Sequence, residues 1–196
     1  MSDDHGSSLI SAQVRHVEAL LESRGLLDDG EIDRRIDEFA QGGTPANGAR
    51  VVARAWVDPG FADRLLADAN AALPEVGLSM AGGLQEQRLK VVANTAQEHN
   101  VVVCTLCSCY PIALLGPSPS WYKSEAYRSR VVRDPRGVLA GFGLQLPAAT
   151  RIAVWDASAE SRYMVLPRRP AGTEGLTEDE LAGLVTRKGL IGTAAV

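Results

Sequence analysis

The sequence has no long apolar run, and this shortage argues against a membrane-spanning protein. No stretch approaches the ~20 consecutive apolar residues that a membrane-spanning helix needs. The start of the chain, MSDDHGSS, is acidic and polar, whereas a signal peptide is first basic and then apolar. We therefore expect a cytoplasmic protein with no membrane partner.

An excess of positive charge is also missing, which argues against nucleic acid as a ligand. The 196 residues include 20 Lys and Arg against 24 Asp and Glu, a net charge of -4, so the overall field does not attract polyphosphate. Aromatic residues make up only 5% of the chain, yet several gather in one basic stretch. We interpret its aromatic residues as core or subunit-interface anchors and its arginines as bridges to a partner chain. The stretch contains Trp121, Tyr122, Lys123, Tyr127, Arg128, Arg130, Arg133 and Arg136.

The overall composition is that of a folded protein, and the first predicted elements of the chain are helices. Hydrophobic residues make up 45% and charged residues 22% of the chain, both ordinary values for a globular protein. Apolar spacing predicts helices over residues 8–24 and 31–39, and the segment GGTPANG separates them from the rest of the chain. Their narrow apolar faces indicate an N-terminal helical arm, residues 1–43, although a helical cap on the same domain fits the pattern equally.

The remaining residues, 44–196, are predicted to form a mixed α/β metal-binding domain with a β-sheet core. Strands are predicted from β-branched runs over residues 89–93, 101–104, 151–155 and 162–166. Helices are predicted over residues 48–56, 58–73 and 121–132, from Asp134 onward, and from the capping box at Thr177 to about Val185, where the last helix ends. The whole chain is therefore expected to be an α+β protein.

The chain has three cysteines, and all of them lie within six residues. Cys104, Cys107 and Cys109 occur in VVVCTLCSCYP, where a predicted strand turns into a loop. Crosslinks between such near neighbours are strained and close no long loop, so a disulfide scaffold is excluded. Metal binding or redox chemistry is favoured.

Two common metal sites fit the three thiols poorly. A structural zinc site takes four ligands, and the fourth would have to be His99 or a residue of another chain. A four-iron cluster lacks its fourth cysteine. His99 itself, a lone histidine just before a strand, is more typical of a hydrogen-bonded structural residue than of a ligand or of half a Cys-His nucleophilic pair.

A six-coordinate site fits better, because the end of the motif can form a planar chelate. The sulfur and amide nitrogen of Cys109 would close a five-membered ring on a metal ion, and the sulfur of Cys107 with the nitrogen of Ser108 a six-membered ring. If the two amides lose their protons, this S2N2 plate suits low-spin Fe(III) or Co(III). Cys104 would then occupy one axial position and leave the sixth open, as a catalytic site requires.

These residues also carry a resemblance to a known family. VCTLCSC, the following YP, GPSPSWYKSEAYRSRVVRDPRGVL and WDASAESRYMVLPRRPAGTE resemble the α subunit of nitrile hydratase, over the region from NGARVVARAWVDP to LVTRKGLIG. The resemblance implies hydration of a nitrile to the primary amide at a non-haem iron or non-corrin cobalt ion. It also implies that Cys104, Cys107, Ser108 and Cys109 are the ligands, with Cys107 oxidised to sulfinate and Cys109 to sulfenate. Thr105, where iron members usually have serine, favours cobalt(III) over iron(III).

The same resemblance implies catalytic roles and partners. Cys109 is a candidate nucleophile through its sulfenate oxygen, with a metal-activated water as the alternative. Ser108 offers a hydroxyl that could position water, and Gln85 corresponds to a glutamine that faces the family's active site. In the family, arginines of the β subunit hold the oxidised cysteines. We therefore expect a β-type partner, an activator or metallochaperone that delivers cobalt, and no activity of this chain alone.

The residues after CSCYP bear on the substrate. Most relatives have tryptophan and proline there, whereas this chain has the smaller Ile112 and Ala113. A roomier pocket predicts a bulky, heteroaromatic nitrile. This pattern resembles nitrile hydratases that act on nitrile-bearing nucleoside antibiotics such as toyocamycin.

Two alternatives stay open. The metal-bearing subunit of thiocyanate hydrolase shares the cysteine motif, and a substrate assay separates it from a nitrile hydratase. A non-catalytic, zinc-binding interaction module would also use three cysteines and an arm, and it predicts colourless protein with bound zinc.

Overall fold

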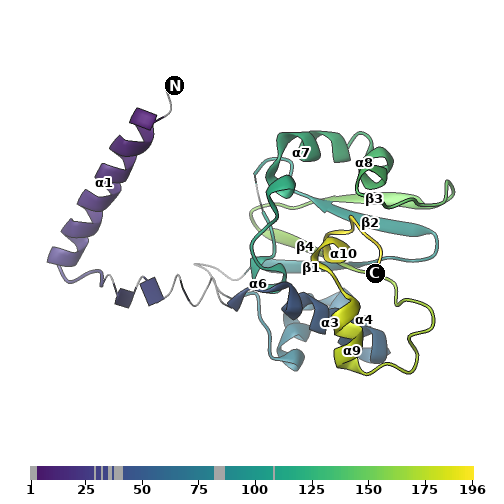
Figure 1. Cartoon of the computed structure of the whole chain (residues 1–196). Coiled ribbons are helices and arrows are strands. Elements are labelled where there is room, and N and C mark those ends of the chain that lie inside the picture. The colour runs from purple at the N-terminus through teal and green to yellow at the C-terminus, as the bar shows by residue number, and fades with distance from the viewer. Residues whose placement is uncertain are drawn as a thin grey trace. The chain divides into compact units, whose positions relative to one another are not determined.

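The computed structural model describes residues 4–28, 30–31, 33–34, 37, 42–81, 87–107 and 109–196. It divides the chain into two compact units, Met1–Gln41 and Gly42–Val196. Most of the helix predicted over residues 31–39 lies outside the described residues. Figure 1 shows the course of the chain within each unit.

The first unit contains one long amphipathic helix, as the apolar spacing predicted. Helix α1 spans Asp4–Ser23, so it begins four residues earlier than expected. It is followed by Gly25, whose φ of 66° favours glycine. Apolar side chains such as Ile10, Val14 and Val17 are exposed along it. No helix in the part of the chain that the structure describes is long and apolar enough to cross a membrane.

The second unit is built on two small parallel sheets, which confirms the expected α+β class. Strand β1 (Arg88–Ala93) pairs with β4 (Ser161–Leu166), and β2 (Glu98–Val103) pairs with β3 (Arg151–Asp156). Figure 1 shows α7 and α8 beside β2 and β3, and α3, α4 and α9 beside β1 and β4, so that helices cover the strands from two sides. All four strands contain the β-branched runs that predicted them.

The helices of this unit begin where capping residues precede them. Thr44, Asp58, Ser124, Asp134 and Thr177 each accept a hydrogen bond from a backbone amide of the first turn. The capping box of Thr177 and Glu180 is present as predicted. The helices that start at these caps are α3 (Pro45–Val57), α4 (Pro59–Ala67), α7 (Glu125–Val131), α8 (Pro135–Gly141) and α9 (Glu178–Leu184).

Two predicted helices are divided into shorter pieces. The helix expected over residues 58–73 breaks at Asp68, because its side chain accepts a hydrogen bond from Ala71 and so caps a new turn. This turn is α5 (Ala69–Ala72), followed by the 3-10 turn η1 (Leu73–Val76). The helix expected over residues 121–132 is a 3-10 turn, η2 (Ser120–Lys123), followed by α7.

Two short helices were not predicted. Helix α6 (Ile112–Leu115) follows the cysteine loop, and α10 (Arg187–Ile191) follows α9, so the helix from Thr177 is not the last. Thr186 caps α10 by accepting a hydrogen bond from Gly189. Four or five residues are too few for a helical apolar period to be visible in a sequence.

The hydrophobic core lies between the strands and the helices that cover them. Val101, Val102 and Val103 of β2 are almost completely buried, as are Phe61 and Leu65 of α4. The strand β2 is therefore fixed by packing along the three residues that precede Cys104.

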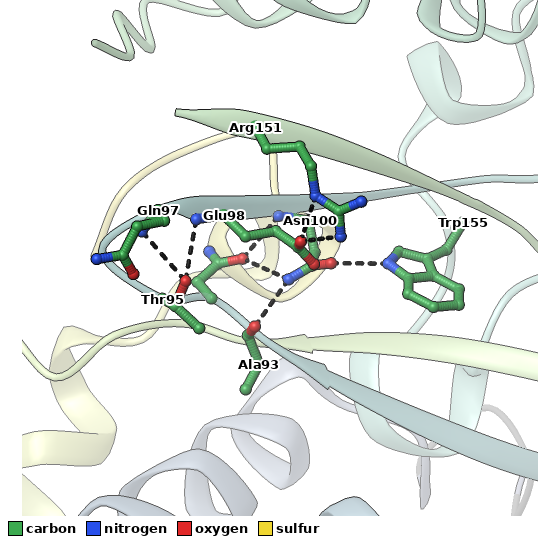
Figure 2. A network of polar contacts seen from close by, with 8 residues as sticks. Ala93, Thr95, Gln97, Glu98, Asn100, Arg151 and Trp155 are labelled. Atoms are coloured by element: carbon green, nitrogen blue, oxygen red, sulfur yellow. Dashed lines mark hydrogen bonds and ion pairs between the residues drawn. The ribbon is translucent and has the colours of Figure 1, made fainter. Parts of the chain in front are cut away.

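Polar groups close the turn between β1 and β2, as Figure 2 shows. The buried side chain of Asn100 donates to the carbonyl of Ala93 at 2.9 Å and accepts from Trp155 Nε1 at 2.7 Å. Thr95 Oγ1 accepts from two backbone amides of the same turn, and Glu98 pairs with Arg151. These bonds fix the amino-terminal end of the β2–β3 pair.

Candidate metal centre

The three cysteines lie at the carboxyl end of the β2–β3 pair. Cys104 follows Val103, the last residue of β2, and is fully buried. The parallel register places Val103 opposite Asp156, so both strands end at the same edge. A further ladder bond, from the amide of Ala157 to the carbonyl of Val103 at 2.7 Å, holds the two chain ends together here.

The three sulfur atoms converge on one point. The Sγ atoms of Cys104 and Cys107 lie 3.2 Å apart, and those of Cys107 and Cys109 lie 3.1 Å apart. Both separations exceed the ~2.05 Å of a disulfide bond. All three sulfurs lie within 4.8 Å of one another, so they can serve as ligands of one metal ion. The structure thus brings together three of the four predicted ligand residues.

The surroundings of Cys109 favour a cation beside its sulfur. Cys109 is only 9% exposed, and burial raises the pKa of its thiol to about 12, with a hydrogen bond to Cys107 acting in the same direction. A buried thiolate is therefore unfavourable unless a positive charge compensates it. A metal ion provides such a charge and binds thiolates rather than thiols. The donor set and its burial fit a thiolate-bound metal.

Asp156 holds the first residue of the loop. Its carboxylate accepts hydrogen bonds from the amide of Thr105 at 2.9 Å and from Thr105 Oγ1 at 2.5 Å. Two bonds to a charged acceptor fix both the main chain and the side chain of this residue. The amide of Cys107 in turn donates to the sulfur of Cys104 at 3.3 Å, which closes a tight turn over Leu106.

Helix α7 and the turn before it hold the loop from another side. Tyr122 donates its hydroxyl hydrogen to the carbonyl of Cys109 at 3.0 Å, and Tyr127 donates to the carbonyl of Val102 at 2.6 Å. Arg128 Nη1 lies within hydrogen-bond distance of the carbonyls of Thr105 and Cys107. The loop is thus bound to neighbouring elements on both sides of its cysteines.

The aromatic and basic stretch makes packing and hydrogen-bond contacts within this chain. Five rings pack edge to face or tilted, with neighbouring ring centroids 4.7 to 6.2 Å apart: Tyr110, Trp121, Tyr122, Tyr127 and Phe142. This confirms the core interpretation of the aromatic residues. Arg128 lies within hydrogen-bond distance of the loop carbonyls of Thr105 and Cys107, and Arg136 donates to the carbonyls of Leu146, Pro147 and Thr150. That the arginines bridge to a partner chain stays a prediction.

His99 is a structural residue, as predicted. Its Nε2 donates to the carbonyl of Gly192 at 2.7 Å, and its Nδ1 accepts from Asn94 at 3.2 Å. Burial lowers the pKa of His99, although the bond to Gly192 opposes this, so the neutral ring is favoured. With both ring nitrogens engaged, His99 offers no fourth ligand to a zinc ion.

Two of the predicted site residues lie outside the described residues: Ser108, the predicted amide ligand, and Gln85, the predicted active-site glutamine. Ile112 and Ala113, which were expected to widen the substrate pocket, are both half-buried. Ala113 accepts a hydrogen bond through its carbonyl from Asn47, which joins α6 to α3.

The fold and the converging sulfurs define a metal-binding α+β protein whose ligand loop lies at the carboxyl ends of two parallel strands. Over residues 8–194 the chain matches the family model of the nitrile hydratase alpha chain. The chain belongs to this family.

Two relatives show how close this similarity is. The α subunit of the low-molecular weight cobalt-containing nitrile hydratase of Rhodococcus rhodochrous is 52% identical over 185 residues, covering 94% of this chain and 88% of the relative. The α subunit of the cobalt-containing nitrile hydratase of Pseudonocardia thermophila is 48% identical, covering 97% of this chain and 93% of the relative. A solved double mutant of the Fe-type nitrile hydratase of Comamonas testosteroni Ni1 superposes with a TM-score of 0.84 at 40% identity, covering 96% of this chain and 90% of that one.

Thiocyanate hydrolases are also similar. The γ subunit of the enzyme from Thiobacillus thioparus is 48% identical over 158 residues, which cover 76% of this chain and 65% of the relative. A recombinant thiocyanate hydrolase with partially modified cobalt centres superposes with a TM-score of 0.86 at 41% identity, covering 99% of this chain and 90% of that one. The fold is therefore shared by proteins that act on two different substrates.

The residues that hold the loop in place were not predicted from the sequence. Asp156 lies in the motif WDASAES, but no role was expected for it, nor for the hydroxyl groups of Tyr122 and Tyr127. A carboxylate at the end of a predicted strand is a usable signal, because parallel strands end at the same edge. The pairing of β2 with β3 would have been needed to apply it.

Proposed function

We propose that this chain is the metal-bearing α subunit of a nitrile hydratase that converts a nitrile to the primary amide. The observation that carries the proposal is the convergence of the sulfurs of Cys104, Cys107 and Cys109 within 4.8 Å at the strand ends. The names of two relatives, which describe cobalt-containing nitrile hydratases, support the choice of metal and reaction.

The ligands we propose are three sulfurs and two main-chain nitrogens. Cys104, Cys107 and Cys109 contribute sulfur, and Ser108 and Cys109 contribute amide nitrogen, with Cys107 as sulfinate and Cys109 as sulfenate. Non-corrin cobalt(III) is proposed rather than iron(III), because Thr105 occupies the position where iron members usually have serine. The sulfinate of Cys107 would carry its oxygen atoms at the mouth of the site, where Cys107 is exposed.

The residues around the metal would divide the work of hydration. A bound trivalent ion supplies Lewis acidity, which makes the nitrile carbon electrophilic. Cys109 is the candidate nucleophile through its sulfenate oxygen, which would bond to the nitrile carbon. The water that Ser108 would position would then replace this oxygen on sulfur, so that the net reaction adds one water to the nitrile, and Gln85 would face the substrate. Burial of Cys109 keeps bulk water away from this oxygen, which strengthens its interactions with substrate.

We also propose that the site is completed by a β-type subunit. Leu106 is 90% exposed beside the exposed Cys107, an unusual position for a leucine in a site that must exclude water. A partner that covers this edge would bring arginines to the oxidised sulfurs, as charge-assisted bonds require. A separate activator or metallochaperone would load cobalt, and the complex would work in the cytoplasm.

The proposed substrate is a bulky, heteroaromatic nitrile. Ile112 and Ala113 are smaller than the tryptophan and proline of most relatives, and they follow the cysteine loop directly in α6. Rates for a heteroaromatic nitrile and for acrylonitrile are compared on the purified complex. Activity confined to acrylonitrile would contradict the proposal.

Thiocyanate hydrolysis is the second candidate, because a thiocyanate hydrolase subunit is 48% identical to this chain. Both reactions add water to a carbon–nitrogen triple bond, so the cysteine site suits either. The same complex is therefore assayed with thiocyanate. Hydrolysis of thiocyanate without hydration of nitriles would replace the first proposal with the second.

One experiment tests the metal site directly. The chain is produced together with its partner and activator in cobalt-supplied cells, and the complex is examined by elemental analysis, visible absorption and mass spectrometry of the cysteine peptide. We expect cobalt, a sulfur-to-metal charge-transfer band and a mass gain of three oxygens on that peptide. Colourless protein with tetrahedral zinc and unmodified cysteines would refute the proposal.

A further inference from the structure

Arg128 reaches from helix α7 to the main chain of the cysteine loop. Its Nη1 lies 3.4 Å from the carbonyl oxygen of Thr105 and 3.2 Å from that of Cys107. Its Nε is buried and has no hydrogen-bond partner among the described residues. The two loop carbonyls are therefore the acceptors that the described part of the chain offers to this guanidinium.

The carbonyls that Arg128 reaches belong to Thr105 and Cys107, which lie on either side of Leu106 in the turn of the cysteine loop. The amide of Cys107 closes this turn by donating to the sulfur of Cys104 at 3.3 Å. A donor that holds both carbonyls therefore restrains the turn that brings the sulfurs of Cys104 and Cys107 to 3.2 Å from each other. Arg128 acts on this turn from α7, outside the loop.

The charge of Arg128 has the sign that the proposed ligands need. Thiolates, oxidised sulfurs and a metal-bound amide nitrogen are anionic, and part of an amide anion's charge resides on its carbonyl oxygen. A guanidinium remains protonated under all ordinary conditions and forms strong bonds to such oxygens. On the other side of the turn, the carboxylate of Asp156 accepts from the amide and hydroxyl of Thr105. Thr105 is thus held at both its nitrogen and its oxygen.

We infer that Arg128 is a positioning residue for the metal site. It holds the main chain at Thr105 and Cys107 and places a positive charge beside the loop, so that the loop is shaped for the metal before the metal arrives. The inference rests on the proposed function, because it takes Cys104, Cys107 and Cys109 as ligands of one metal ion. It adds a cation from this chain to those that the partner subunit would supply.

Three variants of the chain in complex with its partner test this role. Arg128→Met keeps an unbranched side chain but removes the positive charge and the hydrogen-bond donors. Arg128→Lys keeps a positive charge and hydrogen-bond donors on a smaller ammonium group. Arg64→Met is the matched control, because Arg64 lies on α4 and its side chain pairs with Glu75. Cobalt content and the charge-transfer band are measured after production in limiting cobalt. Hydrogen–deuterium exchange of the loop peptide is measured on metal-free complex.

We expect Arg128→Met to lower cobalt content and to shift the charge-transfer band, because loss of an outer partner costs about 10–100-fold in metal affinity. Loop exchange should accelerate about tenfold, since bonds to a charged donor are lost. Arg128→Lys should fall between Arg128→Met and the unchanged chain, and Arg64→Met should match the unchanged chain.

Wild-type cobalt content, band position and loop exchange in Arg128→Met would overturn the inference, as would an equal loss in Arg64→Met. If Arg128→Met does not fold, Arg128→Lys decides: faster exchange confined to the loop supports the role, and wild-type exchange refutes it. Should the unchanged complex hydrate no nitrile, the proposed function fails, but the exchange comparison still tests whether Arg128 shapes the loop.

Discussion

The two ends of the β2–β3 pair are built in opposite ways. At the amino-terminal end, Asn100 is 1% exposed, and its amide has partners on β1, on β3 and in the turn between β1 and β2 (Figure 2). At the carboxyl end, three sulfurs face one another and Leu106 is 90% exposed. At the amino-terminal end, the polar side chain finds its partners within the chain. At the carboxyl end, three sulfur ligands are held in place for a metal ion that the chain does not supply. Substitutions at the first should therefore cost stability, and substitutions at the second should cost metal binding and activity.

The largest expected effect is at the carboxyl end. Replacing Cys107 by Ala removes one of three converging sulfurs, so nitrile hydration and cobalt content of the complex should fall by more than about a hundredfold, the upper cost of losing even an outer partner. The free energy of unfolding of the metal-free chain should change by less than about 1 kcal/mol, because the side chain is exposed. Elemental analysis, activity and chemical denaturation measure the three quantities. A fully active Cys107→Ala complex would contradict the assignment of Cys107 as a ligand.

The next largest effect is at the amino-terminal end. Asn100→Ala leaves the carbonyl of Ala93 and the indole nitrogen of Trp155 without their partners, which should lower the free energy of unfolding by about 2–4 kcal/mol. Gln97→Ala, an exposed position in the same turn, is the control and should change it by less than about 0.5 kcal/mol. Urea denaturation measures both. If the Asn100→Ala variant folds but loses its cobalt, substitutions at the amino-terminal end also affect the metal site, and the contrast between the two ends is wrong.

Asp156 offers a finer test of the carboxyl end. Asp156→Asn removes the charge that accepts two bonds from Thr105, and it should weaken cobalt retention about tenfold, at the low end of the cost of an outer partner. Thr105→Val removes one of these bonds and should have a smaller effect. Cobalt content after production in limiting cobalt gives the order. Cobalt retention equal to that of the unchanged chain in both variants would show that Asp156 does not support the loop.

The difference between the two ends also explains what the sequence could predict. Cys104, Cys107 and Cys109 were recognised as a metal site because their chemistry and spacing are local. Asp156 was not, because it lies 51 residues from Thr105, and the parallel pairing that joins them is a property of the fold. The partners of Asn100 were missed for the same reason, since Trp155 reaches it from a different strand.

Local signals also decided which elements were predicted correctly. The capping box at Thr177 and the β-branched strands were confirmed, because each depends on a few adjacent residues. The helix expected over residues 58–73 was wrong at Asp68, where a capping side chain competes with helix continuation. Asp is a common N-cap residue, so the sequence contained a signal for this break. The apolar spacing around Asp68 nevertheless favoured the prediction of one continuous helix.

The smallest expected effect concerns acid and again belongs to the amino-terminal end. The ring of His99 donates through Nε2 to Gly192 and accepts through Nδ1 from Asn94, an arrangement that only the neutral ring allows. Burial lowers the pKa of His99 below its ordinary value of 6.5 in the folded chain. The unfolded chain therefore binds the proton more readily than the folded chain does.

The sign of the pH dependence is set by this difference. Above about pH 6.5 the ring is neutral in both states, and its contribution to the free energy of unfolding is fully present. As the pH falls from there toward the lower pKa of the folded state, this contribution declines, by at most ~1.4 kcal/mol per pH unit for one proton. His99→Gln keeps a donor but cannot titrate, so its stability should fall less steeply over the same window. Denaturation of both chains at several pH values gives the two slopes. Parallel slopes would mean that protonation of His99 does not weaken this end of the strands.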